Sequence, residues 1–217
     1  MICRLLVASA FSLSCACSLA QAEGTAQKPG LSQLAAQSDL VAVAQVVATQ
    51  YEYTRGFPSK GFATLRILIP YKSPLPLNQV RVFEQGIKER ECYFPEISPW
   101  REGERFLVFL EHLEVDRFKG NPDSCALPIL VTDSNHYALR IPQDAISLGE
   151  KGEALVRELV YADPAAYIDS RALTSTTTAK MVEQLKLRQL GDELIYTQGI
   201  RLGDVRRLMG SEALAKQ

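Results

Sequence analysis

The sequence predicts a mainly β protein with helices toward its C-terminal end, built on a small barrel or sandwich. Five or six short apolar segments, separated by turns rich in Gly, Pro, Asn and Asp, occupy about 115 residues before Pro142. After Pro142, apolar residues recur at helical spacing instead. These two observations together indicate the fold class.

The chain begins with a short predicted helix and continues as strands. Segment 31–37 has Leu31, Leu34 and Ala35 on one helical face. Segment 41–53 alternates, which predicts a long, partly buried strand. Further strands are expected over 61–72, ended by Pro70, Pro74 and Pro76, and over 78–86.

The apolar run 106–115 predicts a central strand that is buried on both faces. Two last strands are expected over 125–133 and 136–142, around a turn at 133–135. Residues 23–148 are therefore expected to form the barrel domain.

The tail, residues 149–217, predicts a helical extension packed on the barrel, because fewer than about 70 residues rarely support a separate core. Helices are expected over 153–160, 179–190 and 201–210. Asp163 precedes Pro164, an order typical of a capped helix start.

Composition excludes several classes of protein. Of 217 residues, 47% are hydrophobic and 23% charged, which rules out a disordered, collagen-like or multi-span membrane protein. Basic and acidic residues number 24 and 25, so the formal charge is -1. Because no long basic run is present, the sequence argues against binding of nucleic acid or of anionic lipid surfaces.

The first 22 residues predict a secretory signal. Arg4 is followed by an apolar stretch and by Ala20-Gln21-Ala22, which favours cleavage after Ala22. A transmembrane anchor and lipid attachment at Cys15 or Cys17 are the alternatives. Cleavage leaves residues 23–217 with a charge of -2, since Arg4 is lost. The expected location is the periplasm of a Gram-negative bacterium or the medium, without stable membrane insertion.

Signal cleavage reduces five cysteines to two, Cys92 and Cys125. An even pair in an exported chain predicts one disulfide, and two buried free thiols are the alternative. Closing a loop of this size stabilises a fold by about 3–4 kcal/mol through loop-closure entropy.

Three features together resemble the netrin-like and tissue-inhibitor-of-metalloproteinases (TIMP) group of oligonucleotide/oligosaccharide-binding (OB) barrels. They are Ser38-Asp39-Leu40-Val41 before an alternating strand, the middle Cys92, and the run Gly103-Glu104-Arg105 leading into an apolar strand. The resemblance covers residues 31–145. It implies a five-stranded closed barrel with a helix against it, so the expected class is a small OB-like barrel followed by C-terminal helices.

The family's inhibitors use an N-terminal Cys-x-Cys to chelate the zinc of a protease. Cys15-Ala16-Cys17 has that spacing, and cleavage after Ser14 would expose it. Such a signal has only 14 residues, which is short.

No catalytic, metal or cofactor site is predicted. A zinc site would need Cys92, His112, Cys125 and His136, whose spacing forms no paired-ligand motif. Nucleophile-elbow, phosphate-loop and dinucleotide motifs are also absent from the sequence. Seven carboxylates offer candidates for acid/base chemistry, but basic residues interleave with them, which favours a solvated face: Glu89, Glu91, Glu102, Glu104, Glu111, Glu114 and Asp116.

Aromatic residues gather near Cys92, where Tyr93, Phe94 and Trp100 form a possible ligand patch, with packing around the disulfide as the alternative. Tyr51, Tyr53 and Phe57 surround a turn. The favoured function is an exported, non-enzymatic binding or assembly module with an unidentified protein partner in the bacterial envelope. The alternatives are a TIMP-like metalloprotease inhibitor and a hydrolase that uses surface carboxylates.

Overall fold

A computed structural model describes residues 28–87, 91–97, 102–171 and 173–215. The predicted signal, Cys15, Cys17, Glu89 and Trp100 lie outside these residues. Within the described part of the chain, no helix has the length and apolar character needed to span a membrane.

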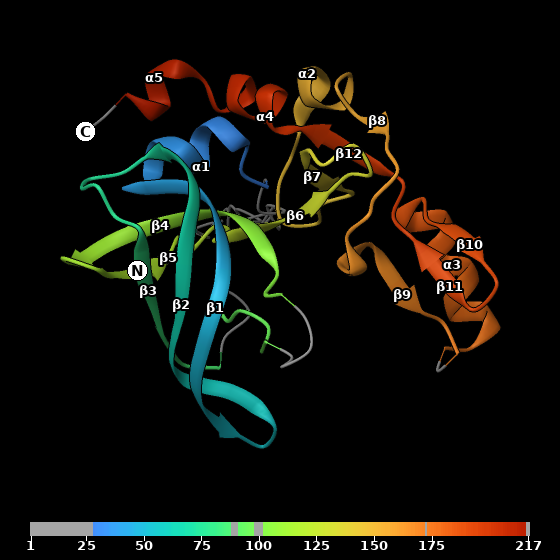
Figure 1. The fold of residues 1–217 in the computed structure, drawn as a ribbon, viewed down its shortest axis with the longest axis horizontal. Helices are drawn as coiled ribbons and strands as arrows, with labels where there is room; N and C mark the ends of the chain where they lie inside the picture. Colours follow the sequence, from blue (N-terminus) through green and yellow to red (C-terminus); the bar gives the residue numbers. More distant parts are fainter. Residues whose placement is uncertain (1–27, 88–90, 98–101, 172, 216–217) are drawn as a thin grey trace, which may run out of the picture.

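Five strands close into a barrel, on the left of Figure 1. Their order is β1-β2-β3-β5-β4, with β4 pairing back onto β1. All pairs are antiparallel except β3 with β5. The strands are β1 (Leu40–Thr54), β2 (Phe57–Lys72), β3 (Gln79–Gln85), β4 (Arg105–Glu114) and β5 (Arg117–Gly120). This closed five-stranded barrel confirms the predicted OB-like class.

The alternation read from the sequence decides which core each barrel residue joins. In β1, Leu40 and Ala42 point into the barrel, whereas Val41 and Val43 belong to a second core beneath the helices. β4 divides in the same way, with its even-numbered residues from 106 to 110 in the barrel and Leu107 and Phe109 outside it. The prediction that this run is buried on both faces is therefore confirmed.

The strand predicted over 61–72 also ends at Lys72 in the structure, so Pro70 lies within β2 and does not end it. Pro70 pairs with Ala42 beside an irregularity in the β1–β2 register, and it is exposed. A proline's missing N–H is tolerated where a bulge interrupts the ladder.

Beyond the barrel the sheet continues through β6, β7, β12 and β8. These are β6 (Ala126–Val131), β7 (Tyr137–Ile141), β12 (Gln198–Arg201) and β8 (Arg157–Glu158). β6 pairs with the same edge of β4 as β5 does, so β4 joins the barrel to the extension.

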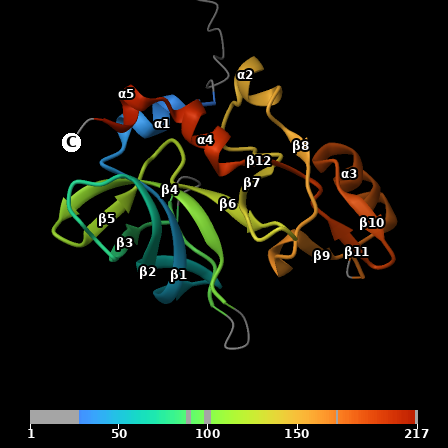
Figure 2. The same cartoon turned by 45° about the horizontal axis from the view of Figure 1, so that its top comes forward.

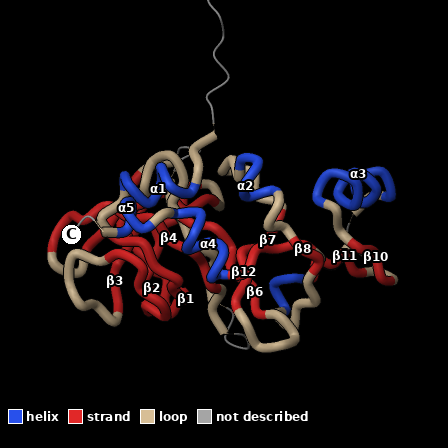
Figure 3. The backbone as a smooth tube through the Cα atoms, turned by 90° about the horizontal axis from the view of Figure 1, so that it is seen from above, coloured by secondary structure: helices blue, strands red, loops and turns tan. Residues whose placement is uncertain are grey.

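Three helices lie over the sheet (Figures 2 and 3). They are the predicted α1 (Leu31–Gln37), together with α4 (Leu202–Met209) and α5 (Ser211–Leu214) from the tail. Leu34 of α1 and Met209 of α4 are fully buried in the core that these helices share with the sheet. The prediction of C-terminal helices is confirmed here.

The remaining tail forms a lobe beside the sheet, at the right of Figure 1. It contains η1 (Pro164–Ala166), β9 (Tyr167–Asp169), α3 (Ser175–Leu185), β10 (Arg188–Leu190) and β11 (Glu193–Ile195), and α2 (Gly149–Glu153) precedes it. A third core, which we call the lobe core, joins this lobe to the sheet: Tyr161, Leu194 and Tyr196 are buried in it together with Leu130 of β6 and Ala138 of β7.

The helix predicted over 153–160 is wrong. α2 ends at Glu153, and Arg157 and Glu158 form β8 against β12. Leu155 packs on the helix-covered core and Leu159 on the lobe core, so the segment serves two cores that lie apart. A single helical face does not reach both.

Candidate functional site

The predicted disulfide is present. Cys92 and Cys125 are bonded, with their Cα atoms 6.0 Å apart. Their thiolates are therefore not free to hold zinc. His112 lies beside Phe118 and His136 hydrogen-bonds Ser134, and no group of three or more potential metal ligands occurs among the described residues.

The predicted aromatic patch is divided by the structure. Phe94 is 4% exposed and packs against Phe106 in the barrel core. Tyr93 is half-buried, with its hydroxyl donating to the Gly86 carbonyl at 2.9 Å and its ring 5.1 Å from that of Tyr51. Trp100 lies outside the described residues. The ligand role of the patch remains a prediction.

Other aromatic residues line a groove of about 850 Å³ at one end of the barrel. The ring centres of Phe62 and Phe83, on the neighbouring strands β2 and β3, lie 5.0 Å apart. The Arg117 guanidinium lies 4.4 Å from the Phe83 ring centre, and Arg81 lies within 6 Å of both rings. At these distances each guanidinium is attracted to the face of the ring by a cation–π interaction.

Two carboxyl groups meet in this barrel-end groove, those of Glu84 and Glu91. Glu84 also accepts a hydrogen bond from the Gly120 N–H at 2.9 Å. Burial, and then the hydrogen bond from its neighbour, raise the pKa of Glu84 to about 7. Glu84 was missed at the sequence level, although it follows Val80 and Val82 in the inward-facing register of β3.

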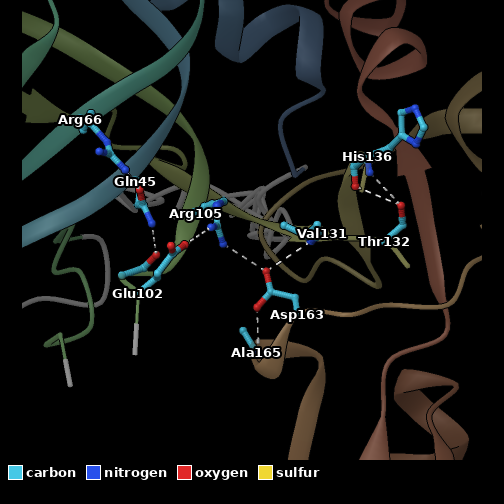
Figure 4. A network of polar contacts seen from close by, with 10 residues as sticks. Gln45, Arg66, Glu102, Arg105, Val131, Thr132, His136, Asp163 and Ala165 are labelled. Carbon is cyan, nitrogen blue, oxygen red and sulfur yellow. Dashed lines mark hydrogen bonds and ion pairs between the residues drawn. The ribbon is translucent and has the colours of Figure 1, made fainter. Parts of the chain in front are cut away.

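A second cavity, of about 550 Å³, opens between the barrel and the lobe, and we call it the interlobe cleft. One wall comes from the segment before β4 and the other from residues 162–165. Figure 4 shows the polar network at its floor. A pocket of this volume at the junction of two lobes is typical of a ligand site.

Arg105 and Asp163 join the two walls of the interlobe cleft. Their side chains are 17% and 9% exposed, and Arg105 Nη1 lies 3.5 Å from Asp163 Oδ2. Arg105 also pairs with Glu102 at 2.5 Å, and its guanidinium carbon lies 6.0 Å from the Tyr137 ring centre. The arginine is therefore held from three sides.

Asp163 receives backbone hydrogen bonds as well. The N–H of Val131 donates to Oδ2 at 3.3 Å, and the N–H of Ala165 donates to Oδ1 at 3.0 Å (Figure 4). The predicted cap at Asp163-Pro164 is confirmed, although it begins a 3₁₀ turn. Its second role, as the partner of Arg105, was not apparent from the sequence.

The segment Gly103-Glu104-Arg105 has a structural explanation. A Cβ on residue 103 would lie 1.8 Å from the Val46 carbonyl oxygen, so only glycine permits this approach. Gln45 of β1 holds the backbone of Gly103 in place, since its side-chain NH₂ donates to the Gly103 carbonyl at 3.0 Å. The side-chain oxygen of Gln45 accepts a hydrogen bond from Arg66.

The interlobe cleft is acidic. Its described lining residues include one guanidinium, Arg105, and four carboxylates, which gives a formal charge of -3. The carboxylates are Glu96, Glu102, Glu104 and Asp163. Such a cavity favours a positively charged ligand.

The fold and its sites define a class of protein, a disulfide-linked OB-like barrel with an appended α/β lobe and a cleft between the two. Comparison of the chain with family models, with curated proteins and with solved structures finds no match. The architecture and the site chemistry therefore carry the functional argument.

Proposed function

We propose that this protein is an exported, non-enzymatic binding module of the bacterial envelope whose interlobe cleft receives a basic segment of a partner protein. The single observation that carries the proposal is the cleft charge of -3 around one paired guanidinium. The signal-like first 22 residues and the Cys92–Cys125 disulfide support export.

The chemistry of the interlobe cleft suits a lysine or arginine side chain. Pro95, Ile97 and Pro164 supply apolar contact for an aliphatic stem, while the carboxylates surround a charged end. Arg105 lines the cleft and already pairs with Glu102 and Asp163. Glu96 and Glu104 are exposed, and Glu96 also accepts a hydrogen bond from the Tyr53 hydroxyl.

A fluorescently labelled hexalysine peptide tests this proposal by polarisation at about 100 mM salt, where screening acts within about 10 Å. The double substitution Glu96→Gln and Glu104→Gln is expected to weaken binding about 10-fold, equivalent to about 1.4 kcal/mol. Glu150→Gln with Glu153→Gln is the matched control, because these exposed residues lie on α2 outside the cleft. Equal weakening by both pairs would show attraction to net charge alone and would contradict the proposal.

Membership of the netrin-like and TIMP group would make a metalloprotease inhibitor the alternative. That function needs Cys15 at the mature N-terminus. Intact-mass measurement of the exported protein distinguishes the two, since a chain that begins at Glu23 lacks the chelating Cys-x-Cys.

A hydrolase is the second candidate, and the carboxyl pair of Glu84 and Glu91 is the observation that favours it. Both residues line the barrel-end groove, and Glu84, with its pKa raised to about 7, can donate a proton near neutral pH. Release of reducing ends from chitohexaose that disappears in Glu84→Gln would favour the hydrolase instead.

A further inference from the structure

A third concave region lies where α4 begins, and we call it the arginine groove. It has a volume of about 1010 Å³ and shares no described lining residue with the interlobe cleft. Its walls come from the turn before β7, from β8 and from the first turn of α4, which lie together in Figure 1.

The charge of the arginine groove is opposite to that of the cleft. Three arginines line it, Arg157, Arg201 and Arg207, against one carboxylate, Asp204. Asp204 already pairs with Arg207. The described lining therefore carries a formal charge of +2 in a protein whose total charge is -1.

Arg157 and Arg201 differ from most other arginines of the molecule. Arg81, Arg117 and Arg188 each pair with a carboxylate. The exposed side chains of Arg157 and Arg201 have no ion pair, hydrogen bond or ring contact within the described residues. Two unpaired guanidiniums in one concavity leave their donors available for an anion.

The surroundings of these arginines leave room for a ligand and offer further hydrogen-bonding groups. A Cβ on Gly203 would meet nothing within 4 Å, so the first turn of α4 is open on that side. His136 and Ser134 also line the arginine groove, and His136 Nδ1 lies 3.3 Å from Ser134 Oγ.

We propose that the arginine groove binds a soluble phosphate ester, with Arg157 and Arg201 as its charged contacts. Guanidinium forks match phosphate oxygens in geometry, and two of them balance a doubly charged group. A concave site favours a small soluble ligand, because a flat lipid surface would not reach into it.

Titration with inorganic phosphate, followed by ¹H–¹⁵N NMR at constant ionic strength, tests the proposal. Saturable shifts are expected at residues 134–136 and 201–204. The double substitution Arg157→Gln and Arg201→Gln is expected to weaken binding at least 10-fold. Arg55→Gln with Arg171→Gln removes the same charge from exposed sites outside the groove and is expected to leave phosphate affinity within 2-fold. The spectra also report whether each variant is folded.

Absence of saturable phosphate binding would overturn the proposal, and so would equal weakening by both variant pairs. Vesicles of phosphatidylcholine with and without phosphatidylglycerol separate the two sources of phosphate. Cosedimentation that depends on phosphatidylglycerol and on Arg157 and Arg201, without binding of free phosphate, would replace the soluble ligand with a membrane surface.

Discussion

The protonation of Glu84 is coupled to the fold. Its pKa rises from an ordinary value of 4.5 to about 7, through burial first and then through Glu91. Between these two values the folded protein keeps a proton that the unfolded chain has lost. The free energy of unfolding therefore falls as the pH rises from about 4.5 to about 7, and this contribution is constant above that range.

Glu84→Gln removes this titration, because an amide stays neutral at every pH of the window. The loss of stability between pH 5 and pH 8 is expected to shrink by about 1–2 kcal/mol, less than the full shift implies, since the carboxyl is partly exposed. Urea unfolding at both pH values measures the change. Glu52→Gln, at an exposed residue that lines the same groove, is the control. If the difference in unfolding free energy between pH 5 and pH 8 were the same in Glu84→Gln as in the wild-type protein, the prediction would be contradicted.

Strand β12 depends on a glycine where it crosses the lobe core. A Cβ on Gly199 would lie 2.1 Å from the Tyr161 hydroxyl oxygen and 2.8 Å from the Leu139 carbonyl oxygen. Gly199→Ala is therefore expected to destabilise the protein by about 2–3 kcal/mol through overpacking. Gly203→Ala, in the open first turn of α4, is the matched control and is expected to be neutral or stabilising by up to about 1 kcal/mol. Thermal and urea unfolding measure both, and similar effects would count against the prediction.

The disulfide ties the segment between β3 and β4 to the residue before β6, across 33 positions of sequence. The double substitution Cys92→Ser and Cys125→Ser is expected to lower the free energy of unfolding by about 3–4 kcal/mol, from loop-closure entropy. Guanidinium unfolding with and without a reductant checks this. The reductant should affect only the wild-type protein, and a wild-type protein insensitive to an effective reductant would contradict the prediction.

At the element level, the sequence predicts strands well where alternation is long. β1 and β4 follow their predicted patterns closely, because alternate side chains of each strand are buried in the barrel core and in the core beneath the helices. β5 was not predicted, since it has four residues and only Phe118 is buried. β8 and β10 have no buried residues, so neither has an apolar alternation to predict it. β8 pairs with β12, which is distant in sequence, whereas β10 pairs with the neighbouring β11 and lies inside the segment 179–190 that was predicted as a helix. Arg105 was not predicted as a site residue, although it shares the register of Leu107 and Phe109 in β4.

At the scale of the whole molecule, Arg105 of the barrel strand β4 and Asp163 at the start of the lobe form a link between barrel and lobe. Asp163→Asn removes the charge that balances a largely buried guanidinium, and is expected to cost about 2–3 kcal/mol. The rate of amide hydrogen exchange should also rise at residues 131 and 165, whose N–H groups donate hydrogen bonds to Asp163. Asp169→Asn breaks an exposed pair with Arg171 and is expected to change little. Equal effects of the two substitutions would argue against a structural role for the Arg105–Asp163 pair.

The proposed role of the interlobe cleft is to receive a basic segment of a partner protein. Site-specific photocrosslinking in intact cells tests it most directly, with p-benzoylphenylalanine introduced at Ala162, which is exposed and lines the cleft. The control position is Leu190, which is 64% exposed on the lobe and away from the lining residues. We expect one discrete adduct from position 162 that is lost when Glu96→Gln and Glu104→Gln are added, and none from position 190. No adduct from position 162, or the same adducts from both positions, would contradict it.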